Sequence, residues 1–213
     1  MSRITANRIL IEGPAGAIET LIEEPEQPRG IAIVCHPHPL FGGALENKVA
    51  QTLARALREL GHVVLRPNFR GVGASAGVHD EGEGETEDVV ALADYARGRW
   101  GELPLALAGY SFGAYVQTRV AKRLAERGRP ARRLVLVGTA AGFVGGARSY
   151  PTEAVPPDTI VIHGEKDTTV PLANVLDWAR AIELPVTVVP DADHFFHRRL
   201  HILRAIVRNA WGH

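Results

Sequence analysis

Several features are scarce in this 213-residue sequence, and each absence narrows the possible functions. The single cysteine, Cys35, excludes an intrachain disulfide and any zinc site built on several cysteines. Neither charge sign dominates, because 24 lysine and arginine residues balance 24 aspartate and glutamate residues, so nothing predicts a nucleic-acid partner. No apolar run approaches the roughly 20 residues that cross a membrane, and the first residues lack the apolar core of a signal peptide. We therefore expect a soluble, cytoplasmic protein with no membrane partner.

Segments typical of strands and of helices alternate along the chain, which predicts an α/β domain with a mostly parallel central sheet. The expected strands cover residues 8–12, 17–24, 30–35, 62–66, 103–108, 133–138, 159–163 and 185–189. The expected helices cover residues 46–60, 86–100, 114–124, 172–182 and 195–211, with Thr86 as the cap of the second. Only a short turn separates the first two strands, so that edge of the sheet should be antiparallel. Because no linker, repeat or low-complexity tract interrupts the chain, we expect one domain, 1–213, with helices on both faces.

The segment Gly109-Tyr-Ser-Phe-Gly113 lies between an expected strand and an expected helix, and its spacing is typical of a nucleophile elbow. The glycines are needed because a sharp turn brings backbone segments too close together for a Cβ atom. Ser111 should stand at the N-terminus of the helix, where free N–H groups favour negative charge. The alternative interpretation is a glycine-rich turn that holds an incidental serine.

Polar residues follow two further expected strands, and they could supply the partners that a serine nucleophile needs. Asp167 comes after the strand at 159–163, and His194 comes after the strand at 185–189. Ligands bind beyond the carboxyl ends of parallel strands, so these side chains should approach Ser111. A serine hydroxyl needs a base, and the base needs an anion that orients it. Nearby residues remain alternatives: Glu165, Asp191 and Asp193 for the acid, and His197 and His201 for the base.

In these motifs, and in the order Ser, Asp, His, the chain resembles the α/β-hydrolase fold superfamily from Arg8 to Trp211. The segment Gly109–Gly113 matches the elbow of that family, His163-Gly-Glu-Lys-Asp167 resembles its acid loop, and Asp193-His194 resembles its histidine loop. The segments His36-Pro-His-Pro and Arg70-Gly-Val-Gly-Ala-Ser are similar to small bacterial members of undefined substrate. The resemblance implies the α/β-hydrolase fold, a catalytic triad of Ser111, Asp167 and His194, and no metal or organic cofactor.

Two backbone N–H groups should stabilise the oxyanion of such an enzyme. One belongs to Phe112, directly after the nucleophile. Similar enzymes usually carry a His-Gly loop after the strand that here ends at Cys35, whereas this chain has His36-Pro-His-Pro. Because proline has no N–H, we expect His38 to be the second donor, with Leu40 as the alternative.

The expected function is hydrolysis of an ester or related acyl bond in a small-molecule substrate. The connection 139–157 is rich in glycine and proline and is too short to form a lid of several helices. We therefore expect an open site, walled by Phe41, Phe143 and Phe195, that prefers short acyl chains.

Other functions are compatible with parts of the sequence. A thioesterase or a peptidase would use the same triad, and a hydrolase-like binding protein would use none of it. The segment 71–76 formally fits the dinucleotide pattern G-x-G-x-x-A, but the acidic residues that follow it at 80–85 would repel a pyrophosphate. We expect that acidic segment to be a solvated loop.

Overall fold

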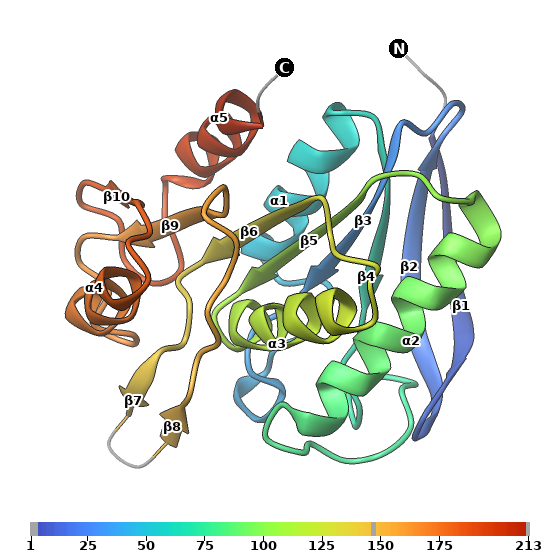
Figure 1. Cartoon of the computed structure of the whole chain (residues 1–213), viewed down its shortest axis with the longest axis horizontal. Coiled ribbons are helices and arrows are strands. Elements are labelled where there is room, and N and C mark those ends of the chain that lie inside the picture. Colours follow the sequence, from blue (N-terminus) through green and yellow to red (C-terminus); the bar gives the residue numbers. More distant parts are fainter. Residues whose placement is uncertain (1–3, 146–147, 212–213) are drawn as a thin grey trace.

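The structure is a computed structural model that describes residues 4–145 and 148–211, and its centre is an eight-stranded sheet (Figure 1). The strands of this sheet lie in the order β1-β2-β4-β3-β5-β6-β9-β10. They are β1 Ile4–Gly13, β2 Gly16–Pro25, β3 Gly30–Cys35, β4 His62–Pro67, β5 Leu105–Tyr110, β6 Arg133–Val137, β9 Ile160–Gly164 and β10 Val186–Val189. A separate hairpin consists of β7 Gly142–Val144 and β8 Arg148–Tyr150. The helices are α1 Lys48–Glu59, α2 Glu83–Trp100, α3 Phe112–Glu126, α4 Leu172–Ala181 and α5 Leu200–Ala210, with a 3-10 turn, η1, at Pro39–Phe41.

The pairing of the strands matches the predicted α/β architecture. β1 and β2 form an antiparallel hairpin, and β2 pairs antiparallel with β4. The remaining pairs of the large sheet are parallel. Every residue of β3 and β5 is buried, as expected for strands that helices cover on both faces. The mostly parallel sheet and its antiparallel N-terminal edge are therefore confirmed.

Two layers of helices bury two apolar cores against the sheet. Helices α2, α3 and α4 cover one face, where residues such as Leu92, Val116 and Val175 pack on the sheet. Helices α1 and α5 cover the other face, where Leu53 and Leu203 are fully buried. Figure 1 shows α2 and α3 in front of the sheet. Burial of apolar area on both faces of the sheet is the main source of stability for this fold.

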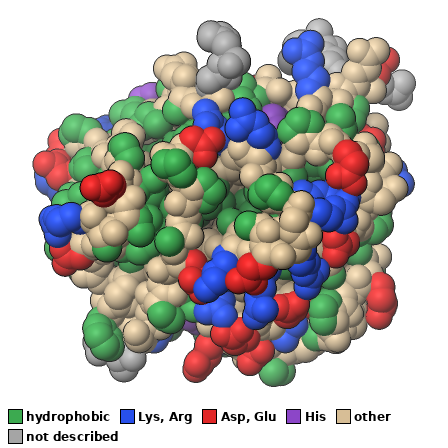
Figure 2. Space-filling model, viewed as in Figure 1, with side chains coloured by type: hydrophobic (Ala, Val, Ile, Leu, Met, Phe, Trp, Pro, Cys, Tyr) green, Lys and Arg blue, Asp and Glu red, His purple; other side chains and the backbone are tan. Residues whose placement is uncertain are grey.

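Basic and acidic side chains alternate on the outer surfaces of α2 and α3, in the lower part of the face shown in Figure 2. Ion pairs join Arg123 with Glu87 and Arg127 with Asp94, and Glu83 pairs with an arginine of α3. Exposed pairs of this kind stabilise a protein by at most about 1 kcal/mol each. The described acidic and basic side chains are therefore interspersed on this face and do not gather into a patch of one charge sign.

The start of α2 differs from the prediction. Thr86 lies inside the helix, where its hydroxyl donates to the Gly82 carbonyl at 2.5 Å, and the helix begins at Glu83. The fully buried Glu85 carboxylate accepts the N–H groups of Gly82 at 2.9 Å and Asp80 at 3.0 Å. The acidic segment predicted to be a solvated loop is therefore partly buried, because it satisfies the free N–H groups at the start of the helix.

The last helix also begins later than predicted, at Leu200 instead of Phe195. Phe196 and Arg198 have φ values of 53° and 59°, which an α-helix does not contain. Phe196 is nevertheless fully buried, so the predicted apolar stripe is correct at this position although the helix is not.

The connection 139–157, of which residues 146 and 147 lie outside the described residues, contains the β7–β8 hairpin, which the sequence did not predict. Its described residues form no helix, as expected. Among the other elements, β1 begins four residues before the predicted start at Arg8, and the remaining bounds agree within two residues.

Candidate active site

Ser111 lies at a sharp turn between β5 and α3, at the carboxyl edge of the sheet. Its backbone angles, φ 56° and ψ −117°, are rare for a residue other than glycine and persist only where the surrounding structure enforces them. A Cβ atom on Gly109 would collide with the carbonyl of Gly113, and a Cβ atom on Gly113 would collide with the carbonyls of Cys35 and His36. The close backbone approach predicted for this motif is thus present in the structure.

Three of the predicted site residues form a continuous chain of hydrogen bonds. The His194 ring places Nε2 at 3.1 Å from the Ser111 hydroxyl and Nδ1 at 2.6 Å from Asp167 Oδ2. The other oxygen of Asp167 accepts the N–H groups of Thr169 at 2.9 Å and Val170 at 2.8 Å. Because Asp167 accepts from Nδ1–H, the lone pair of Nε2 is left to take a proton from Ser111. All three side chains are buried, which strengthens these interactions.

The four carboxylates considered from the sequence differ clearly in their contacts. Asp167 is the one that hydrogen-bonds to His194. The other three have partners toward the surface: His197 for Asp193, Lys166 for Asp191, and the Asp191 N–H for Glu165. Of the alternative bases, His197 and His201 are exposed, so neither lies beside the buried Ser111.

Two further side chains, which the sequence analysis did not assign to the site, support this chain. The Tyr110 hydroxyl donates to the His194 carbonyl at 2.8 Å, and burial raises the pKa of Tyr110, so it remains a donor. His163 Nε2 lies 3.0 Å from the Val170 carbonyl and 3.4 Å from Asp167 Oδ2. Burial lowers the pKa of His163, so this ring contacts Asp167 as a neutral group. The sequence offered one signal for each residue: Tyr110 lies inside the elbow motif, and His163 begins the acid loop.

The peptide between Pro37 and His38 is held in one orientation by the His36 ring. His36 Nε2 accepts the Phe69 N–H at 2.9 Å, and Nδ1 lies 2.6 Å from the Pro37 carbonyl, to which it must therefore donate. Burial lowers the pKa of His36 to about 4, which keeps this ring neutral at pH 7. The C=O and N–H of a trans peptide point in opposite directions, so the bond to Pro37 also fixes the direction of the His38 N–H.

The two candidate second donors differ in how their N–H groups are used. The Leu40 N–H donates to the Nδ1 atom of the His38 ring at 3.3 Å, so it is already engaged. No hydrogen bond from the His38 N–H occurs among the described residues. Phe112, the first donor predicted, is the first residue of α3, where backbone N–H groups have no partner within the helix. The geometry therefore favours His38 over Leu40.

Ser111 opens into a cavity of about 290 Å³. Two of the three predicted wall residues, Phe41 and Phe195, line it together with His38 and Phe112. Phe143 lies on β7 with 72% of its surface exposed and is not a lining residue. The hairpin instead contributes other side chains that the sequence analysis had not singled out, namely Val144, Arg148 and Tyr150.

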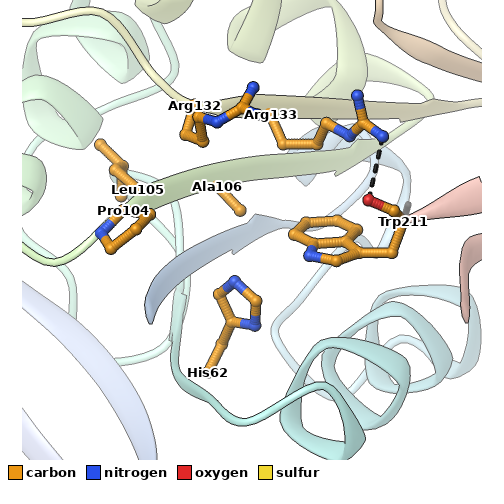
Figure 3. A pocket seen from close by; sticks show the side chains of 7 residues that line it. All are labelled: His62, Pro104, Leu105, Ala106, Arg132, Arg133 and Trp211. Atoms are coloured by element: carbon orange, nitrogen blue, oxygen red, sulfur yellow. Dashed lines mark hydrogen bonds between the residues drawn. The ribbon is translucent and has the colours of Figure 1, made fainter. Parts of the chain in front are cut away.

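A second cavity lies at the opposite end of the sheet, beside the C-terminus of α5 (Figure 3). Figure 3 shows Arg133 directed at the Trp211 carbonyl, to which it donates at 3.0 Å. Arg133 also donates to the Ala210 carbonyl, and the His62 ring packs edge-on against Trp211 at 5.0 Å. The described lining residues include no nucleophile and no carboxylate. This cavity reflects the docking of a helix terminus, and the candidate active site is the cavity at Ser111.

The glycine-rich segment 71–76 has a structural role. Gly73 adopts φ +58°, and a Cβ there would collide with the Glu19 carboxylate. Glu19 accepts the Ala74 N–H and an Asn68 N–H at 2.9 and 2.7 Å, which ties this loop to β2. Within residues 4–145 and 148–211, no three histidine, cysteine, aspartate or glutamate side chains are arranged to bind a metal. The helices of this same part of the chain are too short or too polar to span a bilayer.

Comparison with known proteins identifies the family to which this fold belongs. A family model described as thioesterase domain matches residues 74–210. A lidless α/β serine hydrolase of Xanthomonas campestris superimposes with a TM-score of 0.86 at 38% identity, covering 96% of this chain and 93% of that one. An α/β serine hydrolase homologue of Coxiella burnetii gives a TM-score of 0.84 at 38% identity, covering 100% and 99%. An uncharacterized Rickettsia prowazekii protein is 32% identical over 201 residues, 89% of this chain and 82% of the relative. These similarities confirm the predicted fold and the resemblance to small lidless bacterial hydrolases.

Proposed function

Because this chain belongs to the thioesterase-domain family within the α/β serine hydrolases, we propose that it cleaves an ester or related acyl bond in a small molecule through Ser111, His194 and Asp167. The observation that carries the proposal is the buried hydrogen-bonded chain from the Ser111 hydroxyl through His194 to Asp167, with distances of 3.1 and 2.6 Å. A serine hydroxyl is a weak nucleophile unless an oriented base removes its proton, and this chain provides that base.

In the first half of the reaction, Ser111 Oγ attacks the acyl carbon while His194 Nε2 accepts the hydroxyl proton. The carbonyl oxygen becomes an oxyanion, which the N–H groups of Phe112 and His38 stabilise at the start of α3. Asp167 stabilises the imidazolium that forms on His194. His194 then donates its proton to the leaving alcohol or thiol, and an acyl-serine ester remains.

In the second half, a water molecule takes the place of the leaving group. His194 accepts a proton from this water as its oxygen attacks the acyl-serine carbon. The second tetrahedral intermediate uses the same two N–H groups, and its collapse returns the proton to Ser111 Oγ. The products are a carboxylic acid and the regenerated hydroxyl, so the cycle needs no group beyond the side chains and backbone described.

Thioesters are a second candidate class of substrate, because the matched family model is that of a thioesterase domain. The same triad serves both classes, since a thiolate is a better leaving group than an alkoxide. A matched pair of oxygen and sulfur substrates distinguishes them. We expect turnover of both 4-nitrophenyl butyrate and its S-aryl thiobutyrate counterpart, and the ratio of the two kcat/KM values identifies the preferred class.

Labelling with a fluorophosphonate tests the proposed nucleophile. Ser111 should react covalently, and Ser111→Ala should neither label nor turn over esters, with a loss on the order of a million-fold in kcat. The matched control is Ser149→Ala, because Ser149 is an exposed serine in β8. Failure of the wild-type protein to label, or near-native turnover by folded Ser111→Ala, would show that the protein is a binding protein or uses another nucleophile.

A further inference from the structure

The cavity at Ser111 has an unusual charge balance. Its described lining residues include one permanent cation, Arg148, and no carboxylate. The lining residues next to Arg148 are aromatic or aliphatic: its guanidinium lies over Phe41, its backbone pairs with Val144 across the hairpin, and its side chain lies beside Tyr150. A mostly apolar cavity with one charged group fixes the orientation of a ligand through that group.

Arg148 has no ionic partner among the described residues. Many other arginines of the described residues form ion pairs, for example Arg133 with Asp158 at 2.9 Å and Arg70 with Asp88 at 2.8 Å. No carboxylate of residues 4–145 and 148–211 forms such a pair with Arg148. The two residues before it in the sequence are glycine and alanine, which carry no charge. The positive charge is therefore available to a bound molecule.

The side chain of Arg148 is held at the cavity wall by its contact with Phe41. The guanidinium carbon lies 4.4 Å from the centre of the Phe41 ring, a cation–π geometry. The guanidinium also lies beside the Tyr150 hydroxyl. Because a guanidinium has five N–H donors, one that is held over the Phe41 ring still has donors for a planar or tetrahedral anion. A cation that is positioned before the ligand arrives loses less side-chain entropy on binding.

The positive charge also acts on the part of the wall nearest the expected oxyanion site. The pKa of His38 is lowered to about 4 by burial and by the nearby His79 and Arg148. His38 is consequently neutral at pH 7, and Arg148 remains the cation of this wall. The N-terminus of α3 adds a partial positive charge beside Ser111. The electrostatic environment therefore favours a substrate with a negative group.

We propose that Arg148 makes the enzyme selective for acyl substrates that carry a carboxylate or a phosphate. This inference rests on the proposed function, since it concerns the same cavity and the same reaction. The cavity of about 290 Å³ is small, so the anionic group lies only a few bonds from the scissile carbonyl. The group can belong to the acyl part or to the leaving group, because the guanidinium recognises the same chemistry in both.

The acyl arm of the test uses two esters that differ in one terminal group. In mono-4-nitrophenyl adipate a carboxylate replaces the terminal methyl of 4-nitrophenyl hexanoate. The readout is the ratio of kcat/KM for the anionic substrate to that for the neutral one, with Ser111→Ala as the background. Arg148→Met should lower this ratio by about 10- to 100-fold, the usual effect of a lost charged hydrogen bond, and Arg148→Lys by less.

The leaving-group arm uses 4-carboxyphenyl butyrate and its methyl ester, 4-(methoxycarbonyl)phenyl butyrate, with phenol release as the signal. If Arg148→Met lowers the anionic-to-neutral ratio of kcat/KM in this arm alone, the preferred anionic group belongs to the leaving group. If the ratio falls in the acyl arm alone, the group belongs to the acyl part. The matched control is Arg55→Met, because Arg55 lies on the exposed surface of α1. The anionic-to-neutral ratio of kcat/KM for the wild type should also fall as the salt concentration is raised from about 50 to about 500 mM, because salt screens the attraction between Arg148 and the anionic group.

Equal ratios for the wild type and Arg148→Met in both arms would overturn the inference while leaving the proposed function intact. Absence of turnover of all four esters would instead overturn the proposed function. In that case the selectivity is still measured by calorimetric binding of monoethyl adipate to Ser111→Ala and to Ser111→Ala/Arg148→Met. Binding that is at least about tenfold weaker in the double variant supports the role of Arg148, and equal binding refutes it.

Discussion

Asp167 is anchored more firmly than its contact with His194 alone requires. One carboxylate oxygen accepts two backbone N–H groups, and the other faces both His194 and the neutral ring of His163. The carboxylate therefore cannot rotate away from the base without leaving buried N–H groups unpaired, which costs about 1–3 kcal/mol per group. The orientation of His194 is thus determined by the acid loop as a whole.

Replacing Asp167 by Asn should keep the shape of this loop and remove the negative charge. An amide in this position favours the wrong tautomer of His194, so kcat for an activated ester should fall by about ten-thousand-fold. The matched control is Asp193→Asn, because Asp193 pairs with the exposed His197 and should affect kcat far less. The reverse order of the two effects would assign the acid to Asp193.

The second oxyanion donor can be tested at the level of one N–H group. His38→Ala keeps the backbone N–H and should be mild, whereas His38→Pro removes it and should lower kcat by about a hundred- to a thousand-fold. Circular dichroism of both variants shows whether the loop change has affected the fold. If the two variants turn over esters equally, the donor is another N–H, with that of Leu40 as the first alternative.

Residues with local signals were predictable from the sequence, and residues whose role depends on distant contacts were not. The turn that holds Ser111 is encoded by two glycines, Gly109 and Gly113, which flank it at a distance of two residues, and Asp167 and His194 each come shortly after an apolar strand. The role of the His36 ring depends instead on the N–H of Phe69, 33 residues away in the chain. Arg148 gave no signal because only the folded hairpin brings it to the cavity of Ser111.

At the scale of elements, the β7–β8 hairpin occupies the position where a lid could have been. Figure 1 shows it projecting from the side of the sheet at which β5 and β6 end. Its two strands have three residues each, which is too short for the alternating pattern that identifies a strand in a sequence. The start of α2 was missed for a related reason, because Gly82 has no side chain with which to cap and Glu85 supplies the cap from the following turn.

An open site walled by a short hairpin should prefer short acyl chains. Each additional CH₂ contributes up to about 0.8 kcal/mol only where it can be buried, and a cavity of about 290 Å³ leaves the end of a long chain in water. Across 4-nitrophenyl esters of increasing length, kcat/KM should peak at a short chain and should not rise when lipid aggregates form. A continuous rise to long chains would show that the acyl group has a path not formed by these walls.

At the scale of the whole molecule, buried histidines link stability to pH. Burial lowers the pKa of His36 and His38 to about 4 and also lowers the pKa values of His62 and His163. In the unfolded chain these groups return to about 6.5. The unfolded state therefore binds more protons below that pH, so the contribution of the neutral rings to stability is complete above pH 6.5 and decreases as the pH falls. For His36 and His38 it is lost as the pH approaches 4.

Urea denaturation at pH 7 and pH 5 measures this effect. The free energy of unfolding should decrease on acidification, and His36 alone should account for up to about 1.4 kcal/mol per pH unit in that range. A folded His36→Asn variant should therefore show a shallower pH dependence than the wild type. The control His201→Asn, at an exposed position of α5, should follow the wild type, and identical slopes for all three proteins would contradict the assignment.

The burial of Cys35 has a practical consequence for all of these variants. This cysteine lies in β3 with no exposed surface, Gln117 contacts its sulfur at 3.2 Å, and burial raises the pKa of the thiol. A thiol reagent can reach it only when the centre of the sheet opens. Since the sequence has no other cysteine, the rate of thiol loss under native conditions records those openings without interference. The rate of Cys35 modification therefore measures how often the native structure opens. A variant that is inactive but modified at the wild-type rate has lost its chemistry, whereas one that is modified much faster has lost the stability of its fold.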